Sequence, residues 1–166
     1  MGAAFAAIGG ALAALFEATV ASRLHIADAQ LQIVLVLAIV ATIAFSFEAG
    51  MAVAFVGGLF ADLLFVRPLG ATPVCMLLAV AGTAAVAHYL QISKLLVSVL
   101  SVFVWTMGYL ILSNWMIGLL RPPTYPLHLT SLFWTALINA VLAGLALVIA
   151  AWIRGRWEGR RKAVDW

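Results

Sequence analysis

The sequence predicts an all-α integral membrane protein with six transmembrane helices. Of its 166 residues 66% are hydrophobic and only 9% are charged, whereas a soluble domain carries roughly 25% charged residues. The apolar residues form continuous runs of about the 20 residues that a helix needs to cross the hydrocarbon core, without the alternation of a membrane β-barrel. These features exclude a water-soluble enzyme, a disordered chain and a disulfide scaffold.

The first three predicted spans cover about residues 2–25, 28–45 and 48–66. The first contains no early lysine or arginine, so we interpret it as a retained span and not as a secretion signal. The second opens with Asp28, a residue type favoured at helix N-caps, and has Gln30 and Gln32 in its first turn, within reach of water or headgroups. Only Ser46 and Phe47 separate the second span from the third, which predicts a tight hairpin.

The last three predicted spans cover about residues 72–91, 93–120 and 128–153. The turn Arg67-Pro68-Leu69-Gly70 precedes the fourth span, and three prolines within residues 121–126 exclude a helix between the fifth and sixth. All six spans form one domain over residues 1–153, which leaves residues 154–166 as a basic tail. The cations of this tail are Arg154, Arg156, Arg160, Arg161 and Lys162.

The distribution of positive charge predicts the orientation of the chain. Six spans place both termini on the same side of the membrane, and cytoplasmic segments carry an excess of Lys and Arg. With cytoplasmic termini, the inner segments contain Lys94 and the five tail cations, and the outer turns contain Arg23, Arg67 and Arg121. A basic tail beside a span is typical of a topology signal and a lipid-headgroup anchor, so we expect no nucleic-acid partner.

Asp62 is the most informative polar residue, because an ionised acid within the bilayer is unfavourable unless protein surrounds it. Its helix face consists of small residues spaced three or four apart: Gly50, Ala54, Gly57, Gly58 and Ala61. Such a stripe allows another helix to approach closely, so we expect Asp62 to face a helix contact and to need a donor. Arg67, Asn114 and Asn139 are candidates, and the sequence does not choose between them.

Glu17 has a similar environment in the first predicted span. Small residues precede and follow it on the same helix face: Gly10, Ala13, Ala14 and Ala21. For both acids four roles stay open, namely fastening helices together, relaying protons, binding an ion, and contacting another protein chain. Sequence alone does not show whether the helices of Glu17 and Asp62 touch.

The sequence contains no recognisable catalytic or cofactor motif. It has no nucleophile elbow, no zinc-protease motif, no phosphate loop and no dinucleotide-binding glycine pattern. Its histidines, His25, His88 and His128, fall at separate helix ends, and Cys75 is the single cysteine. We therefore expect no enzyme, no metal and no cofactor, and we expect Asn114 and Asn139 to form hydrogen bonds between helices.

The stretch from Gly57 to Gly70 resembles the rod shape-determining protein MreD. That family has a glycine, an aspartate four residues later, apolar residues and a Pro-Leu-Gly-like turn in the middle of a small six-helix chain. The matching residues here are Gly58, Asp62, Leu63, Leu64, Pro68, Leu69 and Gly70. The second span of the family often opens with a Pro-Asp pair, and here Asp28 is followed by Ala29.

The resemblance implies a non-enzymatic subunit of the bacterial cell-elongation machinery in the inner membrane. It implies an MreC-like single-pass partner, and beyond it a RodA–penicillin-binding-protein pair and an MreB-like filament. The implied fold is similar to that of the substrate-binding subunits of energy-coupling-factor transporters. Two alternatives remain, a subunit that binds a vitamin-like molecule and an ion or proton carrier that uses Glu17 and Asp62.

Overall fold

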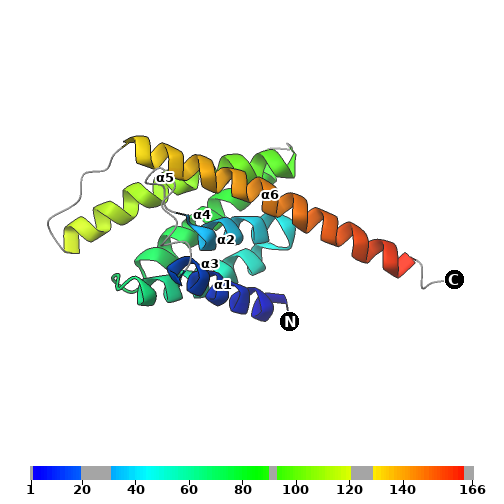
Figure 1. The fold of residues 1–166 in the computed structure, drawn as a ribbon, viewed down its shortest axis with the longest axis horizontal. Helices are drawn as coiled ribbons and strands as arrows, with labels where there is room; N and C mark the ends of the chain where they lie inside the picture. Colours follow the sequence, from blue (N-terminus) through cyan, green and yellow to red (C-terminus); the bar gives the residue numbers. More distant parts are fainter. Residues whose placement is uncertain (1, 20–30, 90–92, 121–128, 163–166) are drawn as a thin grey trace.

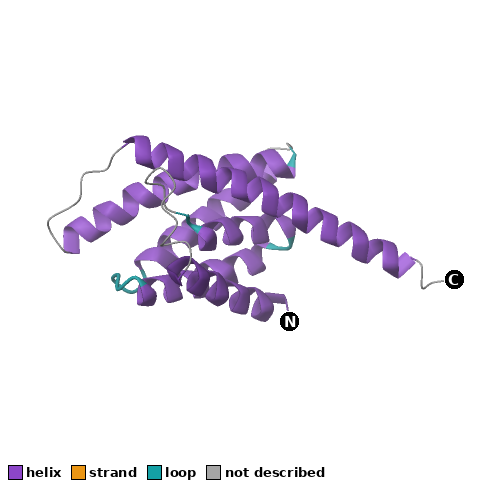
Figure 2. Cartoon of the chain, in the orientation of Figure 1, coloured by secondary structure: helices purple, strands orange, loops and turns teal. Residues whose placement is uncertain are grey.

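The computed structural model describes residues 2–19, 31–89, 93–120 and 129–162, and they form a helical bundle (Figure 1). The helices are α1 (Gly2–Thr19), α2 (Ile33–Ala44), α3 (Phe47–Leu64), α4 (Ala71–Tyr89), α5 (Lys94–Leu120) and α6 (Leu129–Lys162). Figure 2 shows helices and short turns, with no strand in the part of the chain that is described. The prediction of an all-α protein with six helices is therefore confirmed.

Helix α2 is the centre of the bundle. It contacts α1, α3, α4, α5 and α6, while the outer helices pack in the order α1, α3, α4, α5 and α6. Its side chains Val34, Leu35 and Ile39 have no exposed surface. A helix that is apolar on every face is buried in a protein core, and the sequence of α2 is apolar at nearly every position.

Within the described residues, four helices are long and apolar enough to cross a membrane. The spanning segments are Phe47–Leu64, Ala71–Tyr89, Lys94–Leu112 and Thr130–Ile153. The apolar segments of α1 and α2, Ala4–Thr19 and Ile33–Ala44, are shorter. The 12 residues of α2 rise about 18 Å, which is less than the roughly 30 Å of a hydrocarbon core. Four of the six predicted spans therefore have spanning length, α2 does not, and the first predicted span extends into residues 20–25, which lie outside the described residues.

The start of α2 explains this shortness. Residues 31 and 32 are not helical, and Gln32 is the N-cap residue, so the expectation that Asp28 caps this helix was wrong. Asp28 itself lies outside the described residues. The backbone N–H groups of Gln32 and Val34 donate to Asn139 Oδ1 at 3.1 Å and to Glu17 Oε2 at 2.9 Å. Side chains from two other helices thus fix the start of α2 inside the protein.

Small residues allow the helices of the first half to touch along their backbones. A Cβ added to Gly10 of α1 would lie 2.9 Å from Val53 O and 3.2 Å from Gly57 N of α3. A Cβ on Gly58 would lie 2.9 Å from Pro73 Cα of α4, and one on Gly50 would lie 3.0 Å from Ala38 O of α2. The small-residue stripe of α3 therefore packs against α1, α2 and α4 of the same chain.

The remaining boundaries agree with the prediction except at the ends of the chain. Helices α3, α4 and α5 begin and end within two residues of the predicted spans, and residues 45 and 46 form the tight connection before α3. Helix α6 does not end at 153 but continues to Lys162, because no proline interrupts it. The described part of α1 ends at Thr19, so residues 20–25 of the first predicted span lie outside the described residues.

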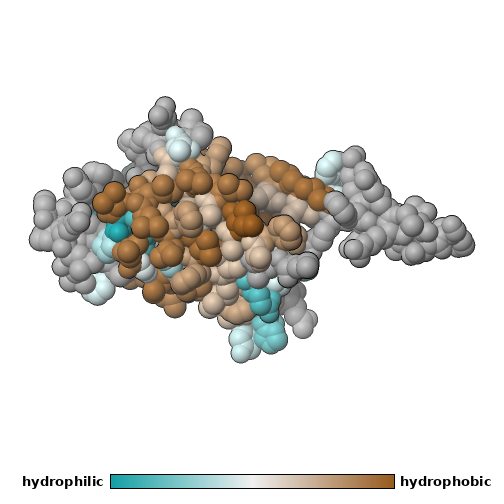
Figure 3. All heavy atoms as spheres, turned by 90° about the horizontal axis from the view of Figure 1, so that it is seen from below, coloured by the Kyte–Doolittle hydropathy of each residue, from teal (hydrophilic) through white to brown (hydrophobic). Residues whose placement is uncertain are grey.

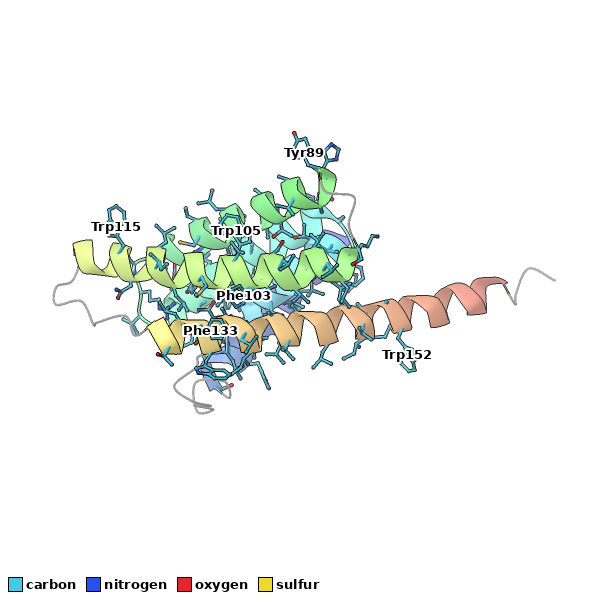
Figure 4. The ribbon with its side chains drawn as sticks, turned by 90° about the horizontal axis from the view of Figure 1, so that it is seen from above. Tyr89, Phe103, Trp105, Trp115, Phe133 and Trp152 are labelled. Atoms are coloured by element: carbon cyan, nitrogen blue, oxygen red, sulfur yellow. The ribbon has the colours of Figure 1, made fainter. Side chains whose placement is uncertain are left out.

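The surface agrees with a membrane location. Hydrophobic residues cover the middle of the face in Figure 3, and the described hydrophilic residues gather toward its two ends. Figure 4 places Trp115 toward one end of the bundle and Tyr89 and Trp152 toward the other, and all three side chains are exposed. Aromatic residues of this kind favour the two membrane–water interfaces.

Candidate functional site

Figure 1 shows that α1 and α3 end, and α2 and α4 begin, toward the same end of the bundle. Polar side chains from these helix ends gather there. We call this group the polar cluster, and it consists of Glu17, Gln32, Asp62, Arg67, Thr72, Tyr109 and Asn139. Gln32, Asp62, Thr72 and Asn139 are each at most 4% exposed. The cluster draws residues from every helix, so the fold and not a local motif assembles it.

Asp62 caps the start of α4. Its Oδ2 accepts a hydrogen bond from the backbone N–H of Gly70 at 2.8 Å, and the carboxylate also accepts from the N–H of Thr72 at 3.3 Å. Its backbone carbonyl accepts from the N–H of Arg67 at 2.9 Å, which closes the C-terminal turn of α3. A wholly buried residue therefore joins the end of one helix to the start of the next.

Glu17 performs the same task for α2. Its Oε2 accepts from the N–H of Val34 in the first turn of that helix, and Asn139 of α6 accepts from the preceding N–H of Gln32. The first N–H groups of a helix have no partner within the helix, and leaving them unpaired in a protein interior is unfavourable. Two outer helices thus satisfy the buried N-terminus of the central one.

Arg67 connects the α3–α4 turn to α5. Its guanidinium donates to Tyr109 Oη at 2.6 Å and lies over the ring of Phe65, 5.0 Å from the ring centroid. Tyr109 Oη is 3.5 Å from Thr72 Oγ1, next to the Asp62 cap. The Arg67 charge also interacts electrostatically with Glu17. The two caps therefore share one polar environment.

Two amide atoms in the polar cluster have no hydrogen-bond partner among the residues that the structure describes. They are Gln32 Oε1 and Asn139 Nδ2, one an acceptor and the other a donor, and both side chains are buried. The expectation that water or headgroups satisfy Gln32 was wrong, because α2 begins inside the bundle. An unpaired buried polar atom is rare in proteins, so this pair marks a place with spare hydrogen-bonding capacity.

Both acids of the cluster hold backbone groups. They accept hydrogen bonds from backbone N–H groups of a different helix or turn. Within the described ranges, no group of three or more His, Cys, Asp and Glu residues could hold a metal ion. What the arrangement does is fix the relative positions of α1, α2, α3, α4 and α6.

The structure brings most of the predicted packing residues into the bundle interior. The buried ones are Ala14, Gly10, Gly50, Ala54, Gly57, Gly58 and Asp62. Glu17, Arg67, Pro68 and Gly70 are partly exposed, and Gly70 adopts a φ of +96°, which favours glycine. Ala21 lies outside the described residues, and so do the side chains of the basic segment from Arg154 to Lys162.

Sequence reasoning missed Thr72 and Tyr109 and misplaced Gln32. The phenol of Tyr109, in the middle of an apolar span, was a usable signal, because a buried tyrosine hydroxyl normally has a partner. Of the three donors considered for Asp62, none has a side chain that donates to its carboxylate, which accepts from the backbone N–H groups of Gly70 and Thr72. Asn139 does bond to another helix as predicted, but as an acceptor for Gln32 N–H.

Comparison with known proteins adds no relative. No protein-family profile matches this chain, and neither the curated proteins nor the solved structures yielded a match.

Proposed function

We propose that this protein is a non-enzymatic scaffold subunit of a bacterial inner membrane, with both termini in the cytoplasm. In this proposal it binds the transmembrane helix of an MreC-like single-pass protein and helps to organise peptidoglycan synthesis during cell elongation. A RodA–penicillin-binding-protein pair and an MreB-like filament are the expected further partners. Its fold would resemble that of the substrate-binding subunits of energy-coupling-factor transporters.

One observation carries the proposal: the residues that resemble MreD act as one structural unit. Gly58 gives Pro73 room to pack, and Asp62 and Gly70 join α3 to α4. The acid of the motif is wholly buried and holds backbone, which supports a structural role for the motif over a catalytic one. A firmly fixed helical body is what a scaffold needs to present a surface to a partner.

The partner surface must lie outside the small-residue stripe, which α1, α2 and α4 already cover. The outer helices do not close the bundle completely, since α1 and α6 do not pack extensively against each other in the described residues. Helix α2 lies between them (Figure 1), and its side chains Ile33 and Leu37, four residues apart on one face, are only partly buried. We place the partner helix in this opening.

Site-specific photo-crosslinking tests this placement. A photoreactive residue at Leu12 of α1 is compared with one at Val104 of α5, because both side chains are 60% exposed. At native expression, we expect position 12, and not position 104, to capture a single-pass protein. Mass spectrometry of the crosslinked adduct identifies the captured protein. Equal capture from both positions, or capture of lipid alone, would contradict the proposal.

Substitution of Asp62 cannot replace that experiment. Because Asp62 holds α4, loss of a partner from Asp62→Leu would report a disturbed fold as readily as a lost contact. Leu37→Trp is the sharper variant, since it fills the opening without touching either cap. We expect it to release the partner while the thermal unfolding of the purified chain stays within a few degrees of the parent.

A second candidate function rests on the unpaired amide atoms. Gln32 Oε1 and Asn139 Nδ2 offer an acceptor and a donor at the buried start of α2, which suits a small polar molecule and favours a transporter-type binding subunit. Mass spectrometry of small molecules retained by the purified protein distinguishes the two. A vitamin-sized ligand that is lost in Asn139→Ala would favour this candidate over the scaffold.

A further inference from the structure

The protein holds Arg67 in place without a described ion pair, and Glu17 is the acid of the polar cluster with which its charge interacts. The Arg67 side chain is partly buried, fixed by the hydroxyl of Tyr109 and by the ring of Phe65. No described carboxylate forms an ion pair with it. A guanidinium has five N–H donors, and among the described residues that of Arg67 donates one side-chain hydrogen bond, to Tyr109.

The position of Arg67 along the chain suits the headgroup region of a bilayer. Arg67 lies in the turn between two segments long and apolar enough to span a membrane, Phe47–Leu64 of α3 and Ala71–Tyr89 of α4. The apolar segments of these two helices therefore end beside Arg67. Trp115, about one turn beyond Leu112 along α5, is exposed, as expected for an interfacial aromatic residue.

The residues beside Arg67 are apolar and exposed. Val66 is 74% exposed and Leu69 is 66% exposed, so they flank the cation on a turn that faces outward. Val66 has a φ of +53°, a conformation that is unfavourable for a β-branched residue. Such strain is often found where a segment binds something.

The start of α4 does not compete for an anion at this turn. The N–H groups of Gly70 and Thr72 donate to Asp62, and that of Ala71 donates to Pro68 O. The guanidinium is therefore the group that an anion would meet. Arginine binds phosphate oxygens in a planar, two-pronged geometry.

We propose that the turn from Phe65 to Gly70 binds the phosphate of an anionic membrane phospholipid. Arg67 binds the phosphate, and Val66 and Leu69 contact the glycerol and the first methylene groups of the acyl chains. Tyr109 and Phe65 hold the guanidinium ready for this contact. The site does not depend on the proposed scaffold role, since it lies on the α3–α4 turn and not in the opening between α1 and α6.

Lipid retention by the full-length chain tests the site. The purified protein is equilibrated in mixed micelles of phosphatidylglycerol and phosphatidylcholine, and bound lipid is measured by native mass spectrometry. Arg67→Gln removes the charge but keeps an N–H donor for Tyr109, and we expect it to lower the phosphatidylglycerol preference about fivefold. Lys94→Ala removes one exposed cation from the opposite end of the bundle and should leave the preference unchanged.

Two further measurements keep the proposal falsifiable. Arg67→Lys should retain most of the preference, and Leu69→Ser should weaken phosphatidylglycerol retention while the fold, checked by circular dichroism, is maintained. Inorganic phosphate at the same concentration should displace little lipid. The proposal fails if Arg67→Gln and Lys94→Ala have equal effects, if Arg67→Lys behaves like Arg67→Gln, or if inorganic phosphate displaces the lipid.

Discussion

The two acids of this protein, Asp62 and Glu17, perform one task in two different ways. Each accepts hydrogen bonds at the start of another helix, Asp62 at α4 and Glu17 at α2. Asp62 reaches backbone groups 8 and 10 residues away and has no exposed surface, whereas Glu17 reaches 17 residues along the chain and is partly exposed.

The difference between the two acids shows that a capping contact can be recognised in a sequence when its residues lie close together along the chain. The Asp62 cap lies within one helix–turn–helix unit, together with its glycines and proline, and so forms a compact motif. The Glu17 cap depends on the positions of α1 and α2, and it is completed by Asn139 from α6. The first is a property of a segment, and the second is a property of the bundle.

The largest expected effect is that of Asp62→Ala. The substitution leaves the N–H of Thr72 unpaired in a buried position and that of Gly70 in a partly buried one. It should lower the free energy of unfolding by about 3 kcal/mol. Denaturant titration in detergent–lipid micelles, followed by circular dichroism, measures this. Asp62→Asn keeps an acceptor oxygen and should lower the free energy of unfolding markedly less. A loss below about 1 kcal/mol for Asp62→Ala would mean that the cap contributes little.

Asn139→Ala tests whether the central helix relies on its second cap. The N–H of Gln32 then has no acceptor, and we expect a loss of about 2 kcal/mol by the same titration. Asn139→Asp retains an acceptor oxygen but adds a buried charge. Comparing it with Asn139→Ala separates the contribution of the hydrogen bond from that of side-chain packing. Ala143 is buried on the same helix and serves as the packing control. If Ala143→Gly were equally destabilising, the effect would belong to α6 packing and not to the cap.

Glu17→Ala should have a smaller effect than Asp62→Ala. It removes one acceptor, for Val34 N–H, at a partly exposed position, and we expect a loss of about 1 kcal/mol. Glu17→Gln retains an acceptor oxygen and serves as the matched control. An effect of Glu17→Ala as large as that of Asp62→Ala would contradict the distinction drawn between the two acids.

The smallest expected effect is a small increase in the free energy of unfolding, for Val66→Gly. Val66→Gly relieves the left-handed backbone at the end of α3, which is unfavourable for valine by about 1–2 kcal/mol, but increases the freedom of the unfolded chain. A net gain of about 0.5 kcal/mol is expected by the same titration. Val66→Ala retains the strain and should give none. Val66→Gly should also weaken phosphatidylglycerol retention, because an apolar contact is lost.

The sequence predicted the third, fourth and fifth helices well because their boundaries are local. Ser46 caps α3 by accepting from Ala49 N–H, and the Pro68–Gly70 turn separates α3 from α4. It failed for α2, where the sequence predicted a full span over about residues 28–45 and the helix is Ile33–Ala44. The N–H groups that start this helix meet Asn139 and Glu17, and no local pattern encodes partners 107 and 17 residues away.

The sequence by itself determined that this protein is helical and apolar enough for a membrane, and that its acids need protein partners. Hydrophobicity and charge act on each segment separately, so composition is sufficient for these conclusions. Only the tertiary structure decided which groups meet those acids and which helix becomes the core. These outcomes depend on how six helices pack against one another, and the small-residue stripe of α3 looked free for a partner until α1, α2 and α4 were seen to cover it.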